Sequence, residues 1–169
     1  MKELHLRAME PHDIETIYRW ENDPEVWKYS AAHQPFSQQL LRQFIDEQQG
    51  ADIYLSRQLR LMADNADGTT VGCLDLFDFD PYHHRAGIGL LVDSRQRRQG
   101  YGRALLQEAE TFAHTHLQLH QLHGIVAADN PDCLSIFRHQ GYTNTGILRD
   151  WLYADGSWHD ALSFQKIIE

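Results

Sequence analysis

The sequence has a shortage of basic residues, few cysteines and no long hydrophobic run. Its 169 residues include 15 Lys and Arg against 24 Asp and Glu, a net charge of −9, which disfavours nucleic acid as a partner. No apolar run approaches the roughly 18 residues of a membrane span, and the N-terminal residues lack a signal-peptide core. The two cysteines, Cys73 and Cys133, form no metal-binding pattern and favour a reducing cytosol. We therefore expect a cytoplasmic protein that contacts neither membrane nor nucleic acid.

Hydrophobic residues make up 42% of the chain, which is enough to fill the core of one domain over residues 1–169. Alternating patterns predict strands at residues 4–8, 53–62, 70–79, 85–93, 121–128, 142–153 and 158–168. Helical spacing predicts helices at 11–20, 38–48, 101–117 and 131–141, with Ser37 and Asn130 as N-caps. The expected fold is α+β, with a mixed, mostly antiparallel sheet of six to seven strands and about four helices.

A local basic cluster stands out in this acidic chain. Arg95, Arg97, Arg98 and Arg103 fall within nine residues, around the glycines of Gln99-Gly100-Tyr101-Gly102. A strand precedes the segment and a helix follows it. Glycines let the backbone approach an anion, and the free N–H groups of the first helical turn then point at it. The spacing fits neither a dinucleotide-binding nor a P-loop motif, which disfavours a nucleotide site, while a purely structural turn remains an alternative.

Two motifs resemble those of the GNAT superfamily of N-acetyltransferases. Arg97-x-x-Gly100-x-Gly102 is similar to the superfamily's [Gln/Arg]-x-x-Gly-x-[Gly/Ala] motif. The block from Asn130-Pro131 to Gly141-Tyr142 is similar to its second motif, and the predicted element order also agrees, so the resemblance covers nearly the whole chain. Within the superfamily, Trp20-Glu21-Asn22-Asp23-Pro24 and other short stretches are most similar to the ribosomal-protein and spermidine N-acetyltransferases.

The resemblance implies transfer of an acetyl group from acetyl-CoA, acting as co-substrate, to an amine acceptor in a ternary complex. The acceptor is a small amine, a polyamine or a protein N-terminus. On the cofactor side, the resemblance implies that the backbone of Leu91 and Val92 pairs with the pantetheine arm. It implies that Asn130, Cys133 and Phe137 lie near the pantetheine. The residues implied to bind the pyrophosphate are Arg97, Arg98, Gln99, Gly100, Tyr101, Gly102 and Arg103.

The chain departs from the resembling families at two positions of the proton chemistry. Many relatives have a tyrosine at the position of Phe137, where it protonates the leaving thiolate. In this chain water, Tyr142 or Ser135 is a substitute for that acid. Alternatively no acid is needed, because a thiol is already a fair leaving group. Spermidine acetyltransferases carry a glutamate in the strand where this chain has Gly87. The remaining candidates are Asp75, Asp78 and His84 for catalysis, and Glu21, Asp23 and Tyr82 for substrate binding.

Two further interpretations follow from the same residues. His114, His116, His120 and His123 lack the H-E-x-x-H pattern of a metal site, so we expect a solvated helix end and no metal. Because tyrosine and glutamate are missing at the two positions above, a CoA-binding sensor or interaction module with weak catalysis is the alternative to an active enzyme. We expect a monomer or a homodimer.

Overall fold

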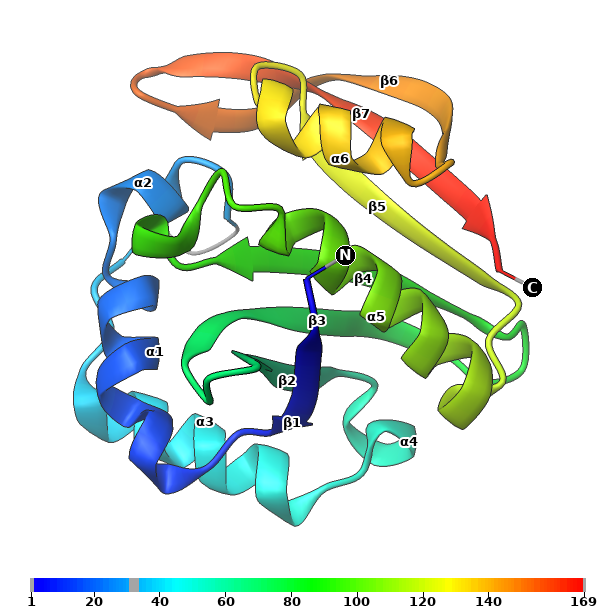
Figure 1. The fold of residues 1–169 in the computed structure, drawn as a ribbon. Helices are drawn as coiled ribbons and strands as arrows, with labels where there is room; N and C mark the ends of the chain where they lie inside the picture. Colours follow the sequence, from blue (N-terminus) through cyan, green and yellow to red (C-terminus); the bar gives the residue numbers. More distant parts are fainter. Residues whose placement is uncertain (1, 31–33, 169) are drawn as a thin grey trace.

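The computed structural model describes residues 2–30 and 34–168 and shows a seven-stranded sheet with helices on both faces (Figure 1). The strand order is β1-β2-β3-β4-β5-β7-β6. Only β4 and β5 pair in parallel, and the other neighbours are antiparallel. The strands are β1 (Leu4–Ala8), β2 (Leu59–Asn65), β3 (Thr70–Asp80), β4 (Arg85–Val92), β5 (Gln121–Ala127), β6 (Thr143–Ala154) and β7 (Ser157–Ile167).

Six α-helices and two 3₁₀ turns are found in the described part of the chain. They are η1 (Pro11–Asp13), α1 (Ile14–Glu21), α2 (Pro24–Trp27), α3 (Gln38–Gly50), α4 (Ile53–Ser56), η2 (Ser94–Gln96), α5 (Tyr101–Leu117) and α6 (Pro131–His139). The four long helices, both hairpins and the mostly antiparallel sheet confirm the expected fold. The predicted N-caps are also confirmed, because Ser37 accepts from Leu40 N–H at 3.1 Å and Asn130 accepts from Cys133 N–H at 3.1 Å.

The strand predicted at residues 53–62 is wrong in its first half. Asp52 caps a single turn of helix, α4, by accepting a hydrogen bond from Leu55 N–H. Arg57 then adopts a left-handed conformation, with φ of 60°, and β2 begins only at Leu59. An aspartate that caps a buried isoleucine turn therefore outweighs the alternating apolar pattern that favoured a strand.

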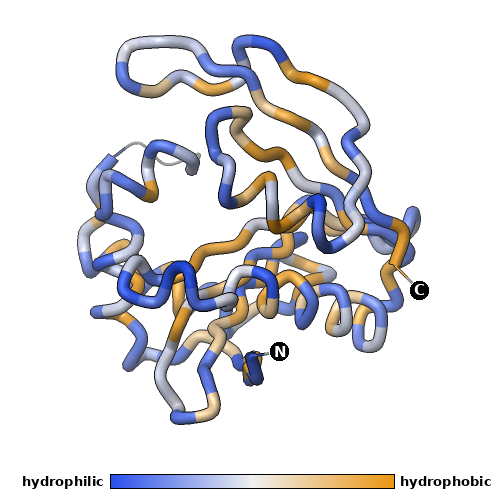
Figure 2. Tube along the Cα trace, turned by 45° about the horizontal axis from the view of Figure 1, so that its top comes forward, coloured by the Kyte–Doolittle hydropathy of each residue, from blue (hydrophilic) through white to orange (hydrophobic). Residues whose placement is uncertain are grey.

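Side chains alternate along the central strands and supply two cores on opposite faces of the sheet. On one face, Leu74, Leu76 and Ile88 pack with the apolar stripe of α5 and with α6. On the other face, Met62 and Cys73 pack with residues of α1 and α3. Figure 2 shows the hydrophobic residues concentrated in the central strands, with hydrophilic residues along the outer turns. In the described ranges, no helix is long and apolar enough to cross a membrane.

The parallel pair β4–β5 is short and then opens. Its register covers only Arg85, Ala86 and Gly87 of β4, opposite residues 121–123 of β5. Beyond this point β5 stays paired with β7 as far as Ala127 and leaves β4 (Figure 1). The apolar run at residues 125–128 predicted a strand inside the sheet, and Val126 and Ala127 are indeed buried, whereas Ile125 is 48% exposed in the part of β5 that no longer pairs with β4. The sheet thus contains a wedge-shaped opening between β4 and β5.

Candidate functional site

The loop before α5 presents unpaired backbone donors. Gly100 has φ of +89°, a left-handed conformation that a glycine adopts without strain, and no described side chain caps the helix. The first intrahelical bond printed for this end runs from Ala104 N–H to Gly100 O. The N–H groups of Tyr101, Gly102 and Arg103 therefore lack an intrahelical acceptor and, with the helix dipole, favour an anion.

A buried carboxylate holds this loop in place. Asp93, only 1% exposed, accepts from the backbone N–H of Arg95 at 2.9 Å, from the Arg95 guanidinium and from Trp20 Nε1–H at 3.0 Å, and it pairs with Arg19. Burial alone would raise the pKa of Asp93, but these hydrogen bonds outweigh it and hold the pKa well below its usual range. Arg95 therefore stabilises the loop, and Arg97 Nε donates a long hydrogen bond, 3.5 Å, to Val92 O. Arg98 and Arg103 make no hydrogen bond or ion pair among residues 2–30 and 34–168 and are available to a ligand.

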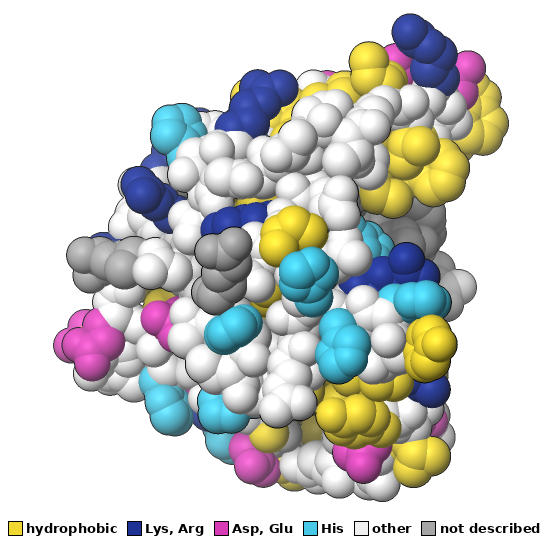
Figure 3. Space-filling view, turned by 90° about the vertical axis from the view of Figure 1, so that its right-hand side faces the viewer, with side chains coloured by type: hydrophobic (Ala, Val, Ile, Leu, Met, Phe, Trp, Pro, Cys, Tyr) yellow, Lys and Arg dark blue, Asp and Glu magenta, His cyan; other side chains and the backbone are white. Residues whose placement is uncertain are grey.

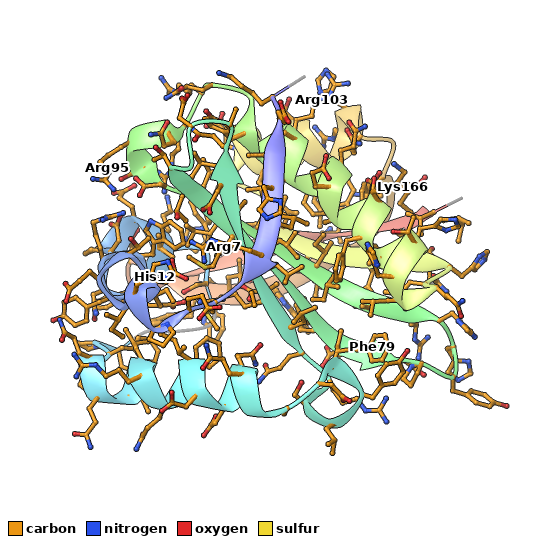
Figure 4. All side chains as sticks on the ribbon, turned by 60° about the horizontal axis from the view of Figure 1, so that its bottom comes forward. Arg7, His12, Phe79, Arg95, Arg103 and Lys166 are labelled. Atoms are coloured by element: carbon orange, nitrogen blue, oxygen red, sulfur yellow. The ribbon has the colours of Figure 1, made fainter. Side chains whose placement is uncertain are left out.

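The remaining loop residues divide between ligand-facing and structural roles. Arg97 and Arg103 are exposed, and Figure 4 shows Arg103 on the first turn of α5 with Arg95 on the loop before it. The Tyr101 ring is buried, so only its backbone can meet a ligand. A Cβ at Gly102 would lie 2.7 Å from Ile136 Cδ1, so this glycine permits close packing of α5 on α6. Arg98 and Gln99 are exposed; Gln99 bonds Gln96.

The backbone of β4 continues from this loop along the edge of the wedge. Asp93 N–H donates to Val71 O at 2.9 Å, and the antiparallel register places Cys73 opposite Leu91. Because bonded and non-bonded pairs alternate, Leu91 directs its peptide groups toward β3, while Leu90 and Val92 direct theirs toward the opening. The strand phase therefore turns the peptide groups of Leu90 and Val92, and not those of Leu91, toward the opening. Pairing of Leu91 and Val92 with a pantetheine arm stays a prediction, and the geometry favours Leu90 over Leu91 for it.

The second motif lies on the far side of the wedge, where α6 begins. Asn130 uses its Oδ1 as the helix cap, and its Nδ2 donates to no described residue. Burial raises the pKa of the Cys133 thiol to about 11, so this cysteine is no nucleophile at neutral pH. Phe137 is 2% exposed and packs on Tyr142 and Phe164. Its ring belongs to the core.

The two substitutes considered for a catalytic acid are held elsewhere. Tyr142 is buried, and burial together with Glu110 raises the pKa of its hydroxyl. Ser135 is exposed and lies 3.2 Å from His139 Nδ1 on the same helix. Among residues 2–30 and 34–168, no contact brings either side chain to the gap-facing edge of β4.

An ion-pair network joins two predicted acidic residues on the face covered by α1 and α3. Arg60 Nε donates to Asp75 at 2.7 Å, and the same guanidinium pairs with Glu21. Arg60 also lies over the Phe44 ring. A cleft of about 340 Å³ adjoins the network, with Glu21, Phe36, Phe44, Glu47 and Arg60 among its lining residues. The sequence analysis did not select Arg60; the signal was a single charge inside the apolar stretch Leu59-Arg60-Leu61-Met62.

The register of strands β2, β3 and β4 places this network beside the wedge. Arg60 stands opposite Asp75 on β3, and Asp75 stands opposite Gly89 on β4. Residues that are direct neighbours across strands share one face of the sheet. Asp75 therefore borders the strip of β4 that leads into the opening, on the side away from α5. Asp23, by contrast, is used as the N-cap of α2, where it accepts from Glu25 N–H at 2.9 Å.

Three of the predicted residues lie at the other end of β4 or beside it. Tyr82 and His84 both lie in the turn between β3 and β4, and His84 Nδ1 contacts Gln118 O at 3.0 Å. Figure 4 shows Phe79, near this turn, at the opposite end of the structure from Arg103. The structure therefore does not bring Tyr82 and His84 together with the loop. Asp78 is exposed, in a bulge of β3 with φ of 48°.

Histidine side chains gather on the face shown in Figure 3. His84, His114 and His120 line a shallow pocket there, at the end of α5. Among residues 2–30 and 34–168, no group of three or more His, Cys, Asp or Glu is arranged to hold a metal ion. His123, grouped with these residues by sequence, lies apart from them on β5. It stands directly opposite Gly87, where the wedge begins.

Comparison with known proteins identifies relatives of this chain. Residues 3–143 match the family model described as acetyltransferase (GNAT) domain. A spermidine N(1)-acetyltransferase from Vibrio cholerae is 22% identical over 94% of this chain and 89% of its own length. The L-amino acid N-acetyltransferase AaaT from Escherichia coli is also 22% identical, over 99% of both chains.

Solved structures show the same fold. The crystal structure of spermidine N-acetyltransferase from Vibrio cholerae in complex with CoA and spermine has a TM-score of 0.88 at 22% identity. The alignment covers 98% of this chain and 95% of that one. At 22% identity this likeness shows the fold.

Proposed function

The chain belongs to the GNAT acetyltransferase family, and on this basis we propose that it transfers the acetyl group of acetyl-CoA to a primary amine whose cationic form binds beside Asp75. The observation that carries the proposal is the continuity of two features. The uncapped start of α5 can receive the pyrophosphate, and the open edge of β4 begins directly before the same loop. One extended ligand with phosphates at one end fits both.

The site offers acetyl-CoA separate groups for its separate parts. The N–H groups at the start of α5 and the exposed Arg97, Arg98 and Arg103 meet the pyrophosphate. Peptide groups of Leu90 and Val92 meet the pantetheine arm as an added strand would. From Val92 to Gly87 the edge is about 16 Å long at about 3.3 Å per residue. The free Nδ2 of Asn130 faces the same ligand from the α6 side.

The same edge can stabilise the reaction. The acceptor amine attacks the thioester carbonyl, and negative charge develops on the carbonyl oxygen. A gap-facing N–H of β4, from Leu90 or Val92, is a fixed donor for that oxygen and needs no reorganisation. One such donor is worth about 10²–10³ in rate. The thiolate then leaves without an acid from Phe137, since a thiol of pKa near 8.5 is a fair leaving group.

The acceptor side is acidic. Glu21 and Asp75 share one cation, Arg60, so the network has a formal net charge of −1. Glu47 adds another carboxylate to the cleft, and Phe36 and Phe44 supply aromatic surface. This lining favours an acceptor that is cationic and partly apolar, such as a small amine or polyamine, over an anionic one.

The test measures binding and turnover separately. Calorimetry with acetyl-CoA tests the donor site, and thiol release is then followed over a panel of polyamines, amino acids, simple alkylamines and peptide N-termini. We expect acetyl-CoA binding and turnover of at least one cationic amine, with anionic acceptors slower. Binding of ATP in preference to CoA would contradict the donor assignment.

The alternative is a CoA-binding sensor or interaction module with weak catalysis. It is favoured by the absence of a tyrosine at Phe137 and of a carboxylate at Gly87. It predicts normal acetyl-CoA binding without turnover of any amine in the panel. The two functions therefore differ in a single measured quantity, thiol release with the cofactor site saturated.

A further inference from the structure

The rings of Phe77 and His123 meet over Gly87 at the closed end of the wedge. Phe77 and His123 flank Gly87 on neighbouring strands, in register with it on each side. Their ring centroids are 6.3 Å apart and the rings are nearly perpendicular, at 87°. A Cβ on residue 87 would lie 2.3 Å from Phe77 Cε2. A side chain at this position would displace the Phe77 ring, so the glycine leaves the ring the place it occupies beside His123.

The next residue of β4 on this face leaves open space. A Cβ at Gly89 would have only ordinary contacts, 3.8 Å to Asp75 Cβ and 3.9 Å to Phe77 Cε1. Gly87 and Gly89 thus form a strip without side chains, directly beside the backbone edge that meets the pantetheine. Asp75 and Phe77 border the strip on one side, and His123 borders it on the other.

His123 is a half-buried imidazole without a hydrogen-bond partner among residues 2–30 and 34–168. Burial lowers its pKa, Asp78 on β3 opposes this shift, and Arg85 on β4 adds to it. Its direct neighbour on β7 is the uncharged Gln165. The net shift is downward, so the ring is neutral at pH 7, with a lone pair on one nitrogen and room for a donor.

We propose that His123 is the proton acceptor for the amine substrate, which lies over Gly89 between Asp75 and His123. The inference rests on the proposed acetyl transfer. An ammonium cannot attack, since its nitrogen has no lone pair. A proton passes from the ammonium to the neutral imidazole; the amine nitrogen then bonds to the thioester carbon. As the tetrahedral intermediate collapses, the C–S bond breaks, the electron pair leaves on the CoA sulfur, and the nitrogen loses a second proton to solvent or to the thiolate.

The test compares two variants of His123 with a matched control. His123→Gln keeps a polar side chain, and His123→Ala leaves space for added imidazole. His116→Gln, at an exposed position on α5, is the control. At pH 7 and saturating acetyl-CoA we expect the His123 variants to lose about 10²–10⁴ in kcat/KM for the best amine, with cofactor affinity and Tm unchanged. The control should keep wild-type activity.

Two readouts separate this role from a structural one. The deficit of His123→Gln should shrink as pH approaches the acceptor's own pKa, about 10.4 for a lysine-like amine, because the amine then needs no base. Free imidazole should restore activity to His123→Ala in proportion to its neutral form. A wild-type enzyme without turnover would overturn the proposed function; active His123 variants with an unchanged pH profile would overturn only the role of His123.

Discussion

The indole Nε1–H of Trp20 donates a 3.0 Å hydrogen bond to the carboxylate of Asp93 and so ties α1 to the loop that precedes α5. Both side chains are buried, at 4% and 1% exposure. The acceptor-side helix and the loop proposed to bind pyrophosphate therefore share one carboxylate. A change in this contact should therefore affect both the acceptor side and the loop before α5.

Asp93→Asn should lower the free energy of unfolding at pH 7 by about 2–3 kcal/mol, because a buried acceptor of charge-assisted hydrogen bonds is replaced by a neutral amide. The pKa of Asp93 is lowered in the folded state, so its stabilisation is present above the unfolded value, about 3.9, and is lost as pH falls through the folded pKa. Urea unfolding at pH 7 and at pH 3 measures this. Asp67→Asn, on an exposed turn, is the control, and an equal loss in both variants would contradict the assignment.

Gly100→Ala should abolish most of the acetyl-CoA affinity while the protein stays folded. A Cβ at φ of +89° strains the backbone by about 1–2 kcal/mol and stands where an anion approaches the helix start. Gly68→Ala is a matched control, because Gly68 has φ of +75° in the β2–β3 turn with nothing within 4 Å. Calorimetry should show weak binding for the Gly100 variant only. Equal affinities would place the pyrophosphate elsewhere.

Gly89→Val and Gly87→Ala should fail in different ways. At Gly89 a Cβ has only ordinary contacts, and the valine methyl groups fill the space proposed for the acceptor, so kcat/KM for the amine should fall on the order of tenfold or more, about 1.4 kcal/mol. Acetyl-CoA affinity and Tm should be kept. At Gly87 the Cβ collides with the Phe77 ring, so stability should fall by about 1–3 kcal/mol. Full activity of the Gly89 variant would move the acceptor off this strip.

Phe137→Tyr tests whether a hydroxyl at this position can serve the leaving thiolate. The ring edge already packs against Gly124, where a Cβ would lie 3.0 Å from Phe137 Cζ. We expect the added hydroxyl to be buried without a partner, lowering stability by about 1–3 kcal/mol with no gain in rate. Phe112→Tyr, half-buried on α5, should be nearly neutral. A faster enzyme at unchanged Tm would show that the hydroxyl reaches the sulfur.

The sequence by itself determined the elements whose signals are local. Ser37 and Asn130 cap helices as their positions predict, Asp155-Gly156 makes a hairpin, and the glycines before α5 mark its start. Each depends on contacts within a few residues, so the chain order contains all the information. The turn of helix at Asp52 was missed because a cap and an alternating pattern overlapped there, and only burial of Ile53 decided between them.

The site was decided by tertiary structure, because its residues meet across strands. The peptide groups of Leu90, and not those of Leu91, face the opening because of the way β3 and β4 alternate their hydrogen bonds. This alternation depends on the register between the two strands and cannot be read from the residues of β4 alone. The network of Glu21, Arg60 and Asp75 joins α1 to the β2–β3 hairpin, and only the folded packing of α1 on the sheet brings Glu21 to Arg60. His123 belongs by sequence to a group of histidines; only the short β4–β5 register separates it from them and sets it beside Gly87.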